Sequence, residues 1–197
     1  YYSFQSKIYD ATRWSFLFGR KSILQQLPFQ QNEAFTLLEI GSGTGYNLVN
    51  LAKKYPKVNL TGVDVSAKMV AIAAQKLAGQ KNVQLINEPY GADTHQLLKH
   101  RPKVILFSYA LTMMNPQWKD LLLQAKNDLT SIGYIAVVDF HNSPFQWFSN
   151  HMLKHHVRMD GHLLPFLQDN FEPLHQSIDR AYGGLWKYFS FVGKLVD

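Results

Sequence analysis

Apolar residues recur along the chain with two alternating spacings, one typical of β-strands and the other of α-helices. Five short apolar runs predict strands, at residues 36–40, 58–63, 83–86, 104–108 and 134–140. Between several of these runs, apolar residues lie three or four positions apart, which predicts helices packed against a sheet. Strands that alternate with helices favour a mostly parallel sheet with helices on both faces.

Local signals predict where several of these helices begin. Ser66 can cap a helix that ends near Gly79, and Asn115-Pro116 and Ser143-Pro144 are typical helix starts, the second for a helix reaching about residue 155. The runs 171–178 and 185–196 are β-like and meet across Gly183-Gly184, which predicts an antiparallel hairpin at the sheet edge. Residues 1–27 read as a helical lid segment within a single domain, 1–197.

Composition narrows the class of protein. With 46% hydrophobic and 17% charged residues, the 197-residue chain can bury a substantial core, and disorder is excluded. There is no cysteine, so disulfides and thiolate metal sites are excluded. The absence of cysteine fits a reducing cytoplasm, where we expect the protein. No apolar run approaches the roughly 20 residues that cross a bilayer, which argues against an integral membrane protein. The net charge of +6 fits a solvated basic surface as well as an anionic partner.

The strongest candidate site is a glycine turn between the first strand and the next helix. Glu39 precedes the run Gly41-Ser42-Gly43-Thr44-Gly45, whose alternating glycines let a ligand approach the backbone. Asp64 ends the second strand, where a carboxylate can accept hydrogen bonds from two ribose hydroxyls. Tyr46 occupies the position at which a dinucleotide-binding loop carries its third glycine, which disfavours NAD.

These residues resemble the cofactor motifs of the class I S-adenosylmethionine-dependent methyltransferases. The resemblance implies an α/β, Rossmann-like fold with a mostly parallel seven-stranded sheet, helices on both faces and an antiparallel last strand. It also implies that S-adenosylmethionine binds and is converted to S-adenosylhomocysteine. Gly41, Ser42 and Gly43 would line its methionine portion, Asp64 would hold the ribose, and Val65 and Met69 would flank the adenine. The partner of the adenine amino group stays open among Glu88, Tyr90, Gly91 and Asp93.

Four further segments, 8–20, 107–114, 137–140 and 182–186, resemble the N-methyltransferases that complete betaine-lipid headgroups and are similar to phosphatidylethanolamine N-methyltransferases. An amine acceptor must lose its proton before it attacks, so a base is expected. The candidates are Tyr9, Tyr109 and His141. Arg20, with Tyr9, is a candidate for a carboxylate of the cofactor or of a headgroup. Ser108, at the end of the fourth strand, completes the candidate cofactor site.

Alternatives remain open on substrate and on surface. The acceptor can be a lipid-headgroup amine or a soluble small molecule, and the domain can also bind the cofactor without catalysis. Ser108-Tyr109-Ala110-Leu111 lacks the Asn/Asp-Pro-Pro-Tyr/Phe sequence of amino-methylating DNA enzymes, which argues against nucleic acid. The histidine-rich run 151–162 favours a basic face for anionic lipid, or a solvated face, over a metal site. We therefore predict no metal, with peripheral contact on the inner membrane face if the acceptor is a lipid.

Overall fold

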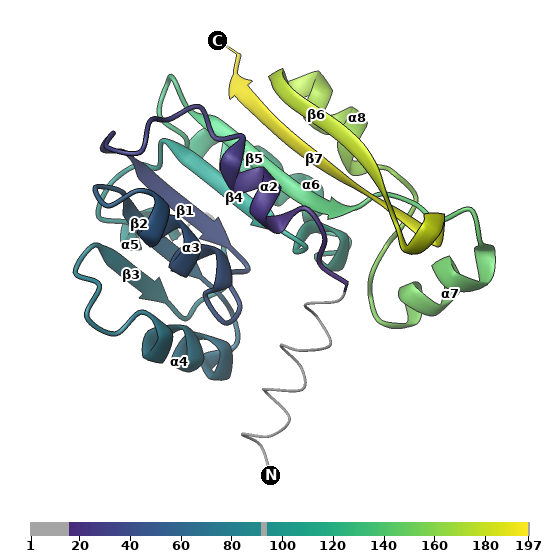
Figure 1. Ribbon diagram of the computed structural model, residues 1–197, viewed down its shortest axis with the longest axis horizontal. Helices are drawn as coiled ribbons and strands as arrows, with labels where there is room; N and C mark the ends of the chain where they lie inside the picture. The colour runs from purple at the N-terminus through teal and green to yellow at the C-terminus, as the bar shows by residue number, and fades with distance from the viewer. Residues whose placement is uncertain (1–15, 92–93, 197) are drawn as a thin grey trace.

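The computed structural model describes residues 16–91 and 94–196, and these form one seven-stranded sheet in the order β3-β2-β1-β4-β5-β7-β6 (Figure 1). The strands β1 to β5 are parallel, and β7 runs antiparallel between β5 and β6. The predicted fold class is thus confirmed. The bounds are β1 (Thr36–Ile40), β2 (Asn59–Val63), β3 (Val83–Ile86), β4 (Val104–Ser108), β5 (Tyr134–Phe140), β6 (Phe171–Ala181) and β7 (Trp186–Leu195).

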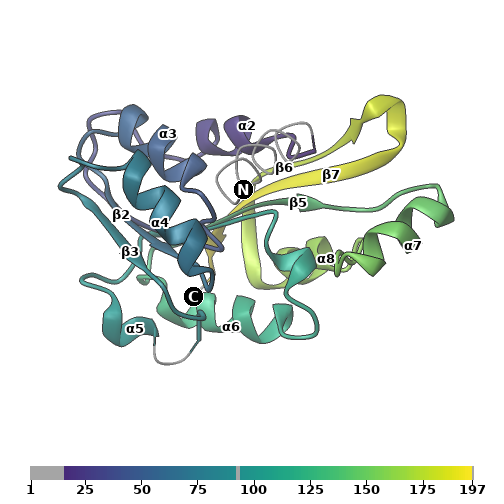
Figure 2. The same ribbon diagram turned by 90° about the horizontal axis from the view of Figure 1, so that it is seen from below.

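Helices cover both faces of the sheet, as Figure 2 shows from its edge. On one face lie α2 (Arg20–Gln25), α3 (Tyr46–Lys54) and α4 (Ala67–Lys76). On the other lie α5 (Thr94–Leu97), α6 (Trp118–Asp128) and α8 (Leu163–Asn170). The helix α7 (Gln146–Lys154) projects beyond the sheet, near the turn of the β6–β7 hairpin. Two short 3-10 turns, η1 (Leu111–Met113) and η2 (Tyr182–Gly184), follow β4 and β6.

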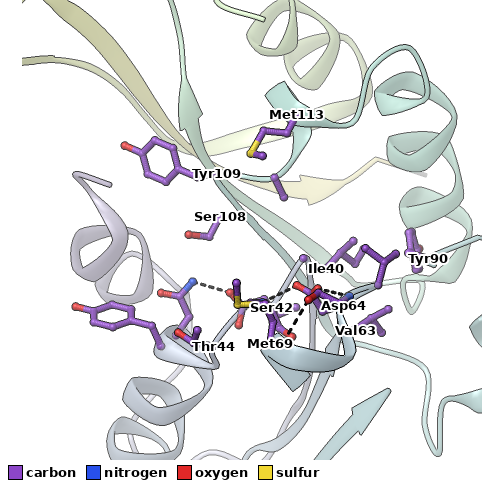
Figure 3. A pocket seen from close by; sticks show the side chains of 18 of the residues that line it. Ile40, Ser42, Thr44, Val63, Asp64, Met69, Tyr90, Ser108, Tyr109 and Met113 are labelled. Carbon is purple, nitrogen blue, oxygen red and sulfur yellow. Dashed lines mark hydrogen bonds between the residues drawn. The ribbon is translucent and has the colours of Figure 1, made fainter. Parts of the chain in front are cut away.

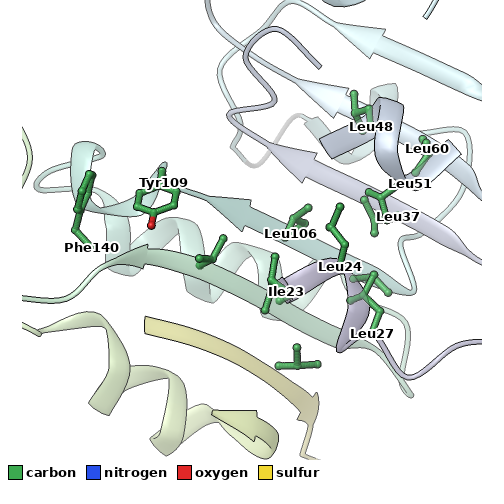
Figure 4. Close-up of a cluster of buried hydrophobic side chains, with 14 of the residues drawn as sticks. Ile23, Leu24, Leu27, Leu37, Leu48, Leu51, Leu60, Leu106, Tyr109 and Phe140 are labelled. Atoms are coloured by element: carbon green, nitrogen blue, oxygen red, sulfur yellow. The ribbon is translucent and has the colours of Figure 1, made fainter. Parts of the chain in front are cut away.

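The hydrophobic core consists of two clusters, one on each face of the sheet. Side chains alternate along each strand, so Leu37 packs under α2 and α3 while Leu38 packs under the helices of the opposite face. Figure 4 shows the first cluster, in which Ile23 and Leu24 of α2 meet the strands. This burial holds α2 against the sheet, where it contacts α3, β5 and β7.

Several predicted boundaries change in the structure. Ser66 caps α4 as predicted, accepting a hydrogen bond from the Met69 amide at 3.4 Å. Asn115 does not cap α6, which begins at Trp118; its amide group instead donates to the Thr112 carbonyl at 2.7 Å. Ser143 caps no helix either, because α7 begins at residue 146 and the Ser143 hydroxyl donates to the Leu185 carbonyl at 2.6 Å. At both positions, the side chain that was expected to cap a helix instead donates a hydrogen bond to a backbone carbonyl in a loop.

The N-terminal segment differs from the prediction in its described part. Of residues 16–27, only Arg20–Gln25 is helical, and the helix is held by burial of Ile23 and Leu24. Residues 1–15, including Tyr9, lie outside the described residues. The sequence pattern did not predict α8, whose apolar residues bury under β7 and β6.

Candidate active site

A cavity of about 710 Å³ opens at the carboxyl ends of β1, β2 and β4 (Figure 3). Parallel α/β sheets bind ligands at this edge, where the strand order reverses on either side of β1 and β4. Most of the predicted cofactor residues meet here. Among the residues lining the cavity are Arg20, Glu39, Gly41, Ser42, Gly43, Asp64, Val65, Met69, Tyr90, Ser108 and Tyr109.

The glycine loop shapes the floor of this cavity. Gly41, Gly43 and Gly45 have φ values of 71°, 54° and 75°, in the left-handed region that favours glycine. A Cβ on Gly43 would meet nothing within 4 Å, so its missing side chain leaves space that a ligand can use. A Cβ on Gly45 would lie 3.0 Å from the Ala73 Cβ, so this glycine lets α3 pack closely on α4.

Asp64 joins the end of β2 to the glycine loop. One carboxylate oxygen accepts the Gly43 N–H at 2.8 Å, and the other accepts the Ser66 N–H at 2.9 Å. A carboxylate has about four acceptor positions, so each oxygen retains one for a ligand. Two parallel acceptors at this edge can receive the two hydroxyls of a ribose.

Glu39 is a buried carboxyl group beneath the loop. The Asn47 side chain donates to one of its oxygens at 2.6 Å, and the other oxygen has no hydrogen-bond partner among the described residues. Burial raises the pKa of Glu39 to about 7, against the lowering effects of the Asn47 hydrogen bond and the nearby Arg20 charge. An acidic oxygen left without a partner beside a cavity suits a cationic ligand group. Asn47 was missed at the sequence level, although it lies eight residues after Glu39, two helical positions into α3.

Arg20 reaches the cavity from the start of α2. Its guanidinium carbon lies 3.9 Å from the centre of the Tyr46 ring, so a cation–π contact orients it. Leu17, three residues earlier, also lines the cavity. The described part of the N-terminal segment therefore contributes both an apolar and a cationic side chain to the wall.

The opposite wall comes from the end of β4 and from η1. Figure 3 shows Ser108, Tyr109 and Met113 across the cavity from Asp64 and Met69. The Ser108 hydroxyl is buried without a hydrogen-bond partner among the described residues. The Tyr109 hydroxyl instead donates to the Phe18 carbonyl at 2.8 Å, which ties the N-terminal segment to β4. Burial, with the nearby Asp139 charge, raises the pKa of Tyr109 well above its usual value.

A buried carboxylate behind this wall holds η1 in place. Asp139, at the end of β5, accepts the Thr112 hydroxyl at 2.6 Å, the Thr112 N–H at 3.2 Å and the Phe140 N–H at 2.8 Å. Burial raises the pKa of Asp139 to about 6 although these hydrogen bonds lower it. The sequence did not single out this pair, which positions Met113 and Met114 on the cavity wall.

The four predicted candidates for the adenine contact lie differently with respect to the cavity. Glu88 and Tyr90 line the cavity, whereas Gly91 does not, and Asp93 lies outside the described residues. The Tyr90 hydroxyl donates to Asp128 at 2.6 Å. Burial, then this partner, raises the pKa of Tyr90. Tyr90 therefore offers its ring to the cavity, and Glu88 offers an exposed carboxylate.

His141 does not reach the cavity. It follows β5 on a loop, where a Cβ on Gly161 would lie 3.0 Å from its ring and Phe189 lies 6.1 Å away between ring centroids. Burial, then the charge of Lys187, lowers its pKa. The sequence placed it near the site because β5 ends beside β4, but the chain turns away toward α7. Within the described ranges no three potential metal-ligating side chains converge, and no helix is long and apolar enough to cross a bilayer.

The strand order, the glycine loop and the acidic residue after β2 are those expected of a class I S-adenosylmethionine-dependent methyltransferase. Residues 37–133 match a family model described as a methyltransferase domain. That match covers the loop, Asp64 and the β4 wall.

Relatives and solved structures agree with this class. Malonyl-[acyl-carrier protein] O-methyltransferases from Bacillus anthracis and Priestia megaterium are 26% and 30% identical over 78% and 72% of the chain. The matches cover 45% and 50% of those relatives, so the chain spans about half their length. These names support the methyltransferase class but not the betaine-lipid subfamily.

The fold also matches solved methyltransferases. The N-methyltransferase NodS from Bradyrhizobium japonicum with S-adenosyl-L-homocysteine gives a TM-score of 0.68 at 14% identity, over 90% of this chain and 87% of that one. Geranyl diphosphate C-methyltransferase from Streptomyces coelicolor, in complex with S-adenosyl-L-homocysteine, gives 0.72 at 12% identity, over 90% and 75%. These two act on nitrogen and on carbon by name, so fold similarity does not select the acceptor atom.

Proposed function

We propose that the chain transfers the methyl group of S-adenosylmethionine to a carboxylate oxygen of an acyl or other small acceptor, forming a methyl ester. The observation that supports this proposal is the composition of the cavity wall across from Asp64. Among the described residues there, Tyr109 is the one titratable side chain, and its hydroxyl is already committed to Phe18. Its raised pKa also disfavours the phenolate that a base would need.

A carboxylate acceptor fits a wall without a base. Carboxylic acids are ionised at neutral pH, so the oxygen can attack without first losing a proton. The oxygen forms a bond to the methyl carbon while the carbon–sulfur bond breaks, and the electron pair stays on sulfur. The sulfonium becomes the neutral thioether of S-adenosylhomocysteine, and no proton moves. The enzyme then supplies mainly alignment and exclusion of water.

The cofactor roles follow the geometry of the cavity. We assign the ribose hydroxyls to Asp64, whose two oxygens each retain an acceptor position. The methionine ammonium faces the unpaired oxygen of Glu39, and the methionine carboxylate faces Arg20. Val65 and Met69 flank the adenine. The remaining contacts of the cofactor are with Gly41, Ser42 and Gly43 of the loop, with Tyr90 and with the end of β4 at Ser108.

The names of the relatives support an O-linked product, since several are malonyl-[acyl-carrier protein] O-methyltransferases. A second candidate is N-methylation of a lipid-headgroup amine. It is favoured by the aromatic rings near Leu17, where Phe18 lies 5.4 Å from Tyr182 and 6.0 Å from Tyr188 between centroids. Such rings can contact a methylated ammonium through cation–π attraction.

One assay separates these candidates. The full chain is incubated with methyl-labelled S-adenosylmethionine and pools of carboxylic or amine acceptors, and the products are then treated with mild alkali. A methyl ester releases volatile methanol, whereas an N-methyl group is stable. We expect alkali-labile label that is lost in Asp64→Ala, while alkali-stable label would reject the carboxylate proposal in favour of the amine.

A further inference from the structure

One end of the molecule exposes large apolar side chains. It consists of residues 141–161, which include α7, and of the hairpin turn at 180–188, and it projects beyond the sheet (Figures 1 and 2). We call it the α7 end. Phe145, Trp147, Leu153 and Tyr182 have exposed fractions of 45%, 64%, 60% and 54%. Scattered single exposed apolar residues are ordinary, but four at one projecting end call for an explanation.

The exposed residues of α7 lie next to buried, stacked aromatic rings. Phe148, on the inner side of α7, stacks on the fully buried Trp186 at 5.4 Å and 7° between ring planes. Trp147 contacts Phe148 edge-on at 5.7 Å, with Phe145 6.4 Å beyond it. Burial of Phe148 therefore orients α7 so that Trp147 faces solvent.

Cations accompany these aromatic residues. Trp147, His151 and Lys154 lie four and three positions apart, on one helical face, and together border a shallow groove on α7. Across residues 141–161 and 180–188, four residues are cationic, Lys154, Arg158, Arg180 and Lys187, and one is a carboxylate, Asp160. Arg158 pairs with Asp160 at 2.7 Å, and Asp179 lies opposite Tyr188 at the start of the hairpin turn, so the excess of positive charge is small. Aromatic residues beside cations are typical of segments that rest in the headgroup region of an anionic bilayer.

The α7 end is also continuous with the mouth of the cavity. Phe16 stacks on the opposite side of Trp186, at 5.2 Å and 11°, and the next residue, Leu17, lines the cavity. A surface that holds α7 would thus lie near the part of the N-terminal segment that lines the cavity.

We propose that the α7 end docks on the surface of anionic lipid bilayers, with Phe145 and Trp147 in the interface and Lys154 against the headgroups. A projecting helix with its largest rings outermost fits a planar, deformable surface. Docking of the α7 end can be tested without methyl transfer. An acidic protein partner is the competing occupant.

The experiment is co-sedimentation of the full chain with vesicles of phosphatidylcholine alone or mixed with phosphatidylglycerol. We expect binding to the anionic vesicles that weakens as salt rises. The variant Phe145→Ser/Trp147→Ser should bind them roughly tenfold or more weakly, because it loses its interfacial rings. The matched control, Ile132→Ser/Leu174→Ser, replaces residues that are 54% and 50% exposed elsewhere and should bind as the wild type does.

Folding and site integrity are checked separately. Both double variants should keep the wild-type melting temperature and affinity for S-adenosylmethionine, because the replaced side chains are exposed and lie outside the cavity lining. Three results would overturn the proposal: no binding of the wild type to anionic vesicles, equal loss in both double variants, or no loss in Phe145→Ser/Trp147→Ser. If the wild type does not bind vesicles but binds an acidic acyl carrier protein through Trp147, the partner of the α7 end is a protein.

Discussion

The ionisation of Glu39 allows a quantitative test of the cofactor site. Its pKa of about 7 in the free protein reflects burial, which outweighs the Asn47 hydrogen bond and the Arg20 charge. In the proposed complex, the ammonium of S-adenosylmethionine lies beside the carboxylate and favours its ionised form. Binding should therefore expel the proton from Glu39. The perturbation is a change of pH, with Glu39→Gln as the matched variant.

The magnitude follows from the two pKa values. A return from about 7 to the ordinary 4.5 corresponds to roughly 3 kcal/mol, at 1.36 kcal/mol for each unit. Below pH 7 the free carboxyl is protonated, so affinity falls as pH falls, and it levels off above pH 7. Because Glu39 is ionised in about a tenth of the free protein at pH 6 and in about nine tenths at pH 8, the affinity of the wild type relative to that of Glu39→Gln should rise roughly tenfold between these pH values.

The assay is calorimetric titration with S-adenosylmethionine at pH 6, 7 and 8, in buffers of different ionisation enthalpy. At pH 7 the wild type should release about half a proton more than Glu39→Gln. Glutamine keeps the oxygen that accepts from Asn47, so the loop should remain in place. The amino group of the ligand titrates in the same range in both proteins, so the difference isolates Glu39. Equal proton release in the two proteins would refute this role.

Three further predictions concern other parts of the site. Asp64→Ala should weaken S-adenosylmethionine binding by about 2–4 kcal/mol, or roughly 30- to 1,000-fold in Kd, in a folded protein; unchanged affinity would reject the ribose assignment. Tyr109→Phe removes the bond to Phe18, so it should cost about 1 kcal/mol in urea unfolding and keep methyl transfer within about tenfold; a loss of about 100-fold or more would restore Tyr109 as the base. Because the folded pKa of Asp139 is raised, its stabilising contribution is full below about 3.8 and is lost as pH rises through about 6. The stability of wild type relative to Asp139→Asn should therefore fall by roughly 2 kcal/mol between pH 4 and 7, and a constant difference would contradict the burial of this carboxyl.

Most of the fold could be predicted from local patterns in the sequence. The strands predicted at residues 36–40, 83–86, 104–108 and 134–140 have these same bounds in the structure, because each is a short apolar run. Three of them, β1, β4 and β5, are buried inside the sheet, whereas β3 forms its partly buried edge. The glycine loop and Asp64 were also recognisable in the sequence. Positive φ angles favour glycine, so the loop shows as alternating glycines, and the residue that follows β2 is acidic. Their meeting at one cavity follows from the parallel order of β1 and β2.

Long-range contacts account for what the sequence did not reveal. The pairing of Asp139 with Thr112 joins residues 27 positions apart, and the bond from Tyr109 to Phe18 spans 91. No local spacing predicts such contacts, since they depend on which strands become neighbours. His141 was placed near the site for the same reason. Its strand ends beside β4, but the direction of the loop that follows is set by packing of α7 on Trp186.

The most direct test of the account is a calorimetric titration of the full chain with S-adenosylmethionine and, separately, with NAD. We expect saturable one-to-one binding of S-adenosylmethionine and no binding of NAD, because Tyr46 and the acidic pair Glu39 and Asp64 suit a cationic nucleoside cofactor. Binding of NAD by a folded protein that ignores S-adenosylmethionine would contradict it.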